Sequence, residues 1–97
     1  MRYILKNGEP VPEPDFLTWM TWMEGAEENH CVAWTEIGDV KVSTIFLGLD
    51  HSLGGGGPVL FETMIFGGEH DEYQERYRTL EEAMIGHERA VNLVKVR

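Results

Sequence analysis

Asp50 and His51 stand side by side where one apolar segment ends, and a run of four glycines, Gly54–Gly57, follows shortly after them. A single carboxylate, Glu62, then interrupts the next apolar segment. An Asp–His pair is used in general acid–base catalysis, and a glycine loop lets backbone amides come close to a ligand. Two strands joined by this loop would bring these residues to one end of a hairpin. We therefore predict that any site lies there.

The same residues lack the wider motifs of catalytic or metal centres. The glycine run leads into Pro58 and a strand-like segment, not into the Gly-Lys-Ser/Thr and helix of a P-loop, so a plain hairpin loop is the alternative. The serines and Cys31 have no recognisable nucleophile motif, and the spacing of histidines and carboxylates matches no metal-ligand pattern. We predict a protein that is not an enzyme and that carries no metal or cofactor.

Two ionisable residues are predicted to lie in apolar surroundings. Glu62 shares a strand face with apolar residues, where an unpaired carboxylate would be costly, so Arg76, Arg78 or Arg89 is expected to pair with it. His87 falls within an apolar helical stripe, which favours a hydrogen-bonded core histidine over a ligand contact. Gly86 beside it costs about 1 kcal/mol relative to alanine in a helix, which indicates close packing or space for a bound group.

Arginines near the end of the chain could complete a site at the hairpin end by binding phosphate. The predicted ligand-binding residues are Asp50, His51, Gly55, Gly56, Gly57, Glu62, Arg76, Arg78 and His87.

The elements that position these residues follow from periodicity and turn signals. Alternating apolar residues predict strands at 31–37, 40–49 and 58–66, with a tight turn at Gly38-Asp39 that sets Glu36 opposite Lys41. Apolar residues at helical spacing predict helices near 15–24, after an Asp15 N-cap, and 79–94, after a capping box that begins at Thr79. We also expect a short strand at 3–5 and a short edge strand at 75–78. The fold predicted is a single α+β domain over 1–97, with an antiparallel meander of at least three strands and two helices.

Both long central strands are apolar on both faces. With only two helices to cover them, one face is left for another subunit, so we expect a homo-oligomer.

Composition limits the possible partners. The chain has 17 acidic and 8 basic residues, a net charge of −9, which disfavours direct binding to nucleic acid. No segment is apolar for long enough to span a membrane or to act as a secretory signal. The single cysteine fits a reducing compartment, and we expect a cytoplasmic protein.

One continuous pattern resembles a known family. It consists of VSTIFLGLDH from Val42, the glycine-rich link, LFETMIFGG from Leu60, and RY-x-T with Glu82-Ala83 and Gly86-His87, and it covers about half of the chain. These motifs are similar to those of a family of small, uncharacterised proteins from tailed-phage genomes and prophages. Members of that family often carry Trp where this chain has Leu80. The resemblance implies a protein that acts in the cytoplasm of an infected bacterium.

Three functions remain open at this point. An oligomer could sequester a nucleotide-derived signal of host antiviral defence, with arginines and aromatic rings holding the ligand. The acidic surface could instead act as a decoy for a basic groove on a host defence protein. A phage structural or accessory role without a ligand is the third. We favour sequestration, because the distinctive residues gather at one hairpin end.

Overall fold

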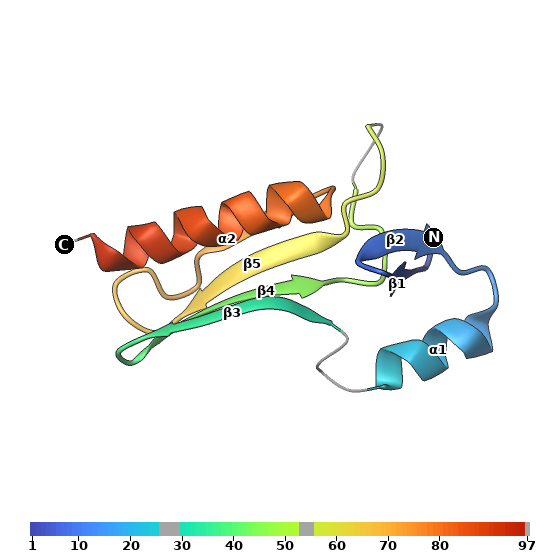
Figure 1. Ribbon diagram of the computed structural model, residues 1–97, viewed down its shortest axis with the longest axis horizontal. Coiled ribbons are helices and arrows are strands. Elements are labelled where there is room, and N and C mark those ends of the chain that lie inside the picture. Colours follow the sequence, from blue (N-terminus) through green and yellow to red (C-terminus); the bar gives the residue numbers. More distant parts are fainter. Residues whose placement is uncertain (26–29, 53–55, 97) are drawn as a thin grey trace.

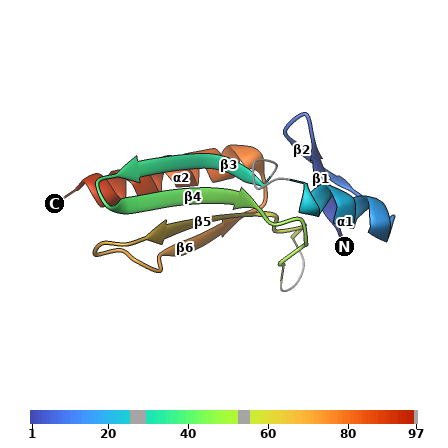
Figure 2. The ribbon, with the colours of Figure 1, turned by 90° about the horizontal axis from the view of Figure 1, so that it is seen from below.

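The computed structural model describes residues 1–25, 30–52 and 56–96. A four-stranded antiparallel sheet in the order β3-β4-β5-β6 carries helix α2 on one face, and a two-stranded hairpin and helix α1 lie beyond one end of it (Figures 1 and 2). The predicted α+β class and antiparallel meander are confirmed. The elements are β1 (Tyr3–Lys6), β2 (Glu9–Pro12), α1 (Phe16–Glu24), β3 (Cys31–Ile37), β4 (Val40–Phe46), β5 (Phe61–Phe66), β6 (Gln74–Tyr77) and α2 (Leu80–Lys95).

The β3–β4 hairpin follows the local sequence closely. Gly38 has a positive φ of 61°, as a two-residue turn between twisted strands requires, and Glu36 pairs across the strands with Lys41 as predicted. The edge strand β6 pairs with β5, so Glu62 lies opposite Arg76.

The two central strands are shorter than predicted at the hairpin end. β4 ends at Phe46 instead of Leu49, because Gly48 turns the chain with a φ of 77° and its carbonyl accepts the amide of Tyr3 at 2.8 Å. β5 begins at Phe61 instead of Pro58, and the Val59 amide donates to the Asp50 side chain instead of to a strand. The N-terminal segment thus bonds to the chain at Gly48 and Leu49, where β4 was expected to continue.

The main core lies between the sheet and α2. One face of each central strand is buried: Val42, Thr44 and Phe46 from β4 and Phe61, Thr63 and Ile65 from β5 are all fully buried. From α2 the buried residues are Ala83, Gly86, His87, Ala90 and Val91. Met84, whose helical spacing also places it on the apolar stripe of this helix, is 42% exposed. The small residues instead form the contact stripe and let the helix come close to the sheet.

Gly86 has a packing role in this core. A Cβ atom built on it would lie only 2.1 Å from the hydroxyl of Tyr77 and 2.2 Å from its Cζ atom. The glycine therefore makes room for the Tyr77 ring, which explains a residue that is unfavourable in the middle of a helix.

Helix α1 packs differently from α2. The Asp15 carboxylate caps it by accepting the Thr18 amide at 2.8 Å, and Gly25 ends it, both as predicted. None of its residues is buried. Its contact with the sheet runs through Trp22, whose ring meets Phe46 edge-on at 5.6 Å, and Trp19 donates its indole N–H to the Gly48 carbonyl. Within the described part of the chain, no helix is long and apolar enough to cross a membrane.

Candidate functional site: an arginine pocket at the edge of the sheet

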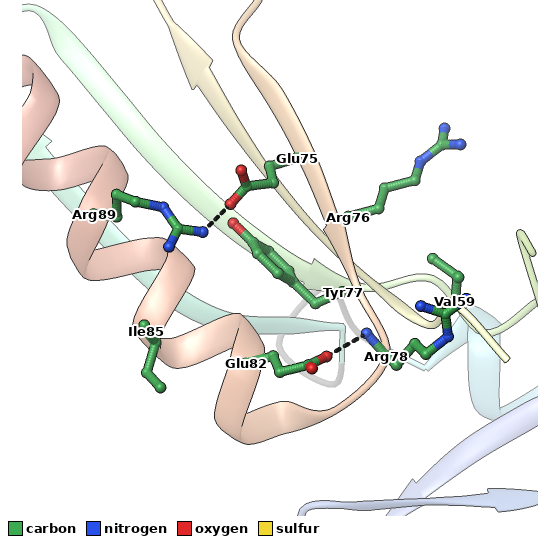
Figure 3. A pocket seen from close by; sticks show the side chains of 8 residues that line it. All are labelled: Val59, Glu75, Arg76, Tyr77, Arg78, Glu82, Ile85 and Arg89. Atoms are coloured by element: carbon green, nitrogen blue, oxygen red, sulfur yellow. Dashed lines mark hydrogen bonds and ion pairs between the residues drawn. The ribbon is translucent and has the colours of Figure 1, made fainter. Parts of the chain in front are cut away.

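A pocket of about 410 Å³ lies where β6 meets the first turns of α2 (Figure 3). Three arginines line it, Arg76, Arg78 and Arg89, and we call it the arginine pocket. The lining also includes the carboxylates of Glu75 and Glu82 and the less polar side chains of Val59, Tyr77 and Ile85.

Both carboxylates of the pocket already have partners. Glu75 forms an ion pair with Arg89, and this hydrogen bond holds the pKa of Glu75 below its usual value. Glu82 belongs to the capping box of α2 and accepts the backbone amides of Arg78 at 3.0 Å and Thr79 at 3.3 Å. The charge of Glu75 is therefore compensated by Arg89, while Glu82 is held by backbone amides.

Arg78 keeps most of its hydrogen-bonding capacity. Its Nε donates to the Gly57 carbonyl at 3.4 Å, a long bond, and its guanidinium lies beside Gly56. Among the described residues, Arg78 has no carboxylate within ion-pair distance. It is exposed, so it can turn toward an anion in the pocket.

Arg76 stands at the rim of the pocket. Its side chain extends from β6 away from Arg89 and Glu75 (Figure 3), and its Nε donates to Glu62 at 2.8 Å. The side chain remains 43% exposed. Burial raises the pKa of Tyr77 to about 12, so this phenol stays neutral and adds no negative charge to the pocket.

Part of the predicted site is brought together here. Gly56 and Gly57, at φ of 100° and 92°, lie against Arg78, while Gly55 lies outside the described residues. Arg89 was considered from the sequence only as a partner for Glu62, and it was missed as a pocket residue. Glu82, Ile85 and Arg89 share one side of α2, and this spacing beside an expected edge strand was the available signal.

Asp50 and His51 form hydrogen bonds at the base of the glycine loop. The Asp50 carboxylate accepts the amides of Ser52 at 2.8 Å and Val59 at 2.9 Å, and these two bonds lower its pKa. His51 contributes its backbone amide, which donates to the Val59 carbonyl. The Asp50 carboxylate therefore fastens the two ends of the glycine loop and does not line the arginine pocket.

Glu62 and His87 do not share a site, because the sheet lies between them. Glu62 is on the face away from α2, where it pairs with Arg76 and Gln74. His87 is on the α2 side, where Thr44 Oγ1 lies 2.8 Å from its Nδ1 and Thr35 Oγ1 lies 2.9 Å from its Nε2. Burial lowers the pKa of His87. Both residues thus take the structural roles that the sequence favoured, an ion pair and a core histidine.

No family profile, characterised protein or solved structure matches this chain. The resemblance to phage proteins stays a prediction. Across residues 1–25, 30–52 and 56–96, no three His, Cys, Asp or Glu side chains converge as metal ligands would.

Proposed function

We propose that the protein binds a small phosphorylated nucleotide in the arginine pocket and thereby sequesters a nucleotide-derived signal of antiviral defence in the cytoplasm of an infected bacterium. The observation that carries this proposal is the gathering of arginine side chains in one place. Three of the 8 basic residues of a chain with a net charge of −9 line one pocket.

The chemistry of the lining suits a phosphate with an apolar portion attached. A guanidinium offers planar, paired N–H donors that match phosphate oxygens, and such charge-assisted bonds are stronger than neutral ones. Arg78 has these donors available beside Gly56 and Gly57, where the lack of side chains leaves the backbone accessible. Ile85 and Val59 give the same pocket an apolar surface on which a base or ribose could pack.

Binding fits this pocket better than turnover. Its described lining contains no histidine, cysteine, serine or threonine that could act as a nucleophile or a neutral base. Its two carboxylates are engaged by Arg89 and by the capping box. A group that holds an anion without attacking it is what sequestration requires.

Native mass spectrometry with a panel of cyclic nucleotides and ADP-ribose derivatives tests the proposal. We expect one member of the panel to add its mass to the protein, and the Arg78→Gln variant to lose this adduct. Lys95→Gln is the matched control, because it removes one positive charge at the far end of α2 and leaves the pocket intact. The proposal fails if no member binds, or if both variants bind like the wild type.

A second candidate function rests on the turn between β5 and β6. Glu69, Asp71 and Glu72 are exposed there, which suits an acidic decoy for a basic groove on a host defence protein. An infection assay separates the two functions. If the decoy is correct, Glu69→Gln with Glu72→Gln abolishes protection of the phage, whereas Arg78→Gln keeps it. Sequestration predicts the reverse, and an accessory role without a ligand predicts no effect of either.

A further inference from the structure

Among the described residues, no helix or strand covers the face of the sheet opposite α2, and we call it the open face. Figure 2 looks onto the sheet with α2 behind it and no element in front. The strand register sets Trp34, Ser43, Met64 and Gln74 in one row across all four strands of this face. We propose that a second copy of this chain packs on the open face, so that two sheets meet face to face in a two-fold dimer.

The open face carries large apolar side chains in contact with solvent. Trp34 is 52% exposed and Phe66 is 44% exposed, and the half-buried Ile45 and Met64 lie on the same face. Aromatic residues and methionine are enriched at protein interfaces, and tryptophan is the commonest residue to dominate binding energy. Helix α1 packs on β1, and its Trp22 meets Phe46, which lies on the α2 side of the sheet.

Charge indicates that the occupant is a second copy. Among the described residues, the strands place four charged residues on the open face, two acidic and two basic, so their formal charges sum to zero. Glu36 lies opposite Lys41 in the register of β3 and β4, and Glu62 forms an ion pair with Arg76. The chain as a whole has a net charge of −9, so two copies repel one another over most of their surface. A neutral apolar face is where identical acidic chains can meet without that repulsion.

Burial of this face leaves the Glu62 carboxylate compensated. The Glu62 side chain is already only 8% exposed and is held by Arg76 and Gln74. A buried charge that keeps its partner avoids the large penalty of an isolated one. The ion pair can therefore be covered by a partner sheet as it stands.

The size of the open face sets the expected stability of the dimer. Four strands at about 4.8 Å spacing and six residues at about 3.3 Å rise give a patch of about 20 Å by 20 Å. Covering it on two copies removes on the order of 800 Å² or somewhat more from solvent, which is the range of weak, reversible complexes. We therefore expect a dimer that dissociates on dilution.

Sedimentation equilibrium between about 1 µM and about 1 mM tests the proposal on the ligand-free protein. The wild type should pass from monomer to dimer in this range. Trp34→Thr and Phe66→Thr should each weaken the dimer at least tenfold, and threonine keeps a good strand former at both exposed positions. Met84→Thr, which changes an exposed apolar residue of α2 outside the arginine pocket, is the matched control and should leave the dissociation constant unchanged.

Two results would overturn the dimer. One is a monomer across the whole concentration range, and the other is a dimer weakened by Met84→Thr but not by the two open-face variants. Circular dichroism on each variant establishes that it is folded before it is compared. Trp34 and Phe66 do not line the arginine pocket, so either result leaves the proposed nucleotide site standing.

Discussion

Gly86 gives a prediction that opposes the usual rule for helices. Replacing a mid-helix glycine with alanine normally stabilises a protein by about 1 kcal/mol. Here the new Cβ atom would lie 2.1 Å, 2.2 Å and 2.4 Å from three atoms of the Tyr77 side chain. The ring cannot simply turn aside, because Tyr77 is 7% exposed and packs in the cluster of Phe46, Leu60, Phe61 and Ala83.

The expected change in unfolding free energy follows from two opposing contributions, the cost of overpacking and the gain in helix propensity. Overpacking a core costs about 1–3 kcal/mol, and contacts this short place Gly86→Ala at about 3 kcal/mol or above. After subtraction of the gain of about 1 kcal/mol in helix propensity, the variant should lose about 2 kcal/mol of unfolding free energy. For a chain of this length, that corresponds to a fall in Tm of about 8–16 °C.

A double-mutant cycle in urea identifies the cause. On a Tyr77→Ala background the obstructing ring is absent, so Gly86→Ala should stabilise the protein by about 1 kcal/mol. The coupling between the two sites should then be about 3 kcal/mol, within the range seen for residues in contact. Glu88→Ala on the exposed side of α2 is the control, with a change within about 0.5 kcal/mol. A higher midpoint for Gly86→Ala alone, or a coupling near zero, would refute the packing argument.

Three further predictions concern a buried histidine, a loop and a helix cap. Burial lowers the pKa of His87 from its usual 6.5, so the unfolded chain takes up a proton at a higher pH than the folded one. The unfolding free energy should therefore fall as the pH drops below about 6.5. Urea titrations should show this fall, with His87→Gln removing it and His51→Gln keeping it. Asp50→Ala removes the acceptor of the Ser52 and Val59 amides, so both amides should exchange faster in deuterium-exchange measurements. Asp50→Asn keeps an acceptor oxygen and should keep the slower exchange. Thr79→Ala breaks the capping box and should cost about 1 kcal/mol in thermal unfolding, while Thr79→Ser keeps most of it.

Features set by neighbouring residues could be predicted from the sequence. The Gly38-Asp39 turn, the Asp15 cap and the capping box each depend on side chains within a few positions of the backbone groups that they satisfy. The alternation that buries Val42 and Ile65 is equally local. These features were therefore accessible without knowledge of the rest of the chain.

Features set by distant residues were not accessible. β4 ends early because the Tyr3 amide takes the Gly48 carbonyl, a contact between the start and the middle of the chain. No strand was predicted at β2, and its pairing of Val11 with Ile4 depends on the turn at Asn7 and Gly8 folding back.

The candidate site shows the same division. Strand alternation places Glu62 and Thr63 on opposite faces of β5, so a helix that covers one of them leaves the other uncovered. The sequence could not say which face α2 would cover. Once α2 packs over Thr63, His87 must lie on that same face of the sheet, next to Thr44. Glu62 must then lie on the opposite face.

Arg76 connects the two proposals, because it lines the arginine pocket and also pairs with Glu62 on the open face. A partner sheet that buries this ion pair would hold Arg76 on the open face and withdraw its remaining donors from a ligand. Ligand binding would then weaken the dimer, and by reciprocity the dimer would weaken ligand binding by the same factor. Arg78 has no such link to Glu62, so Arg78→Gln should abolish binding without changing the dimer. Arg76→Gln is the variant in which both should change together.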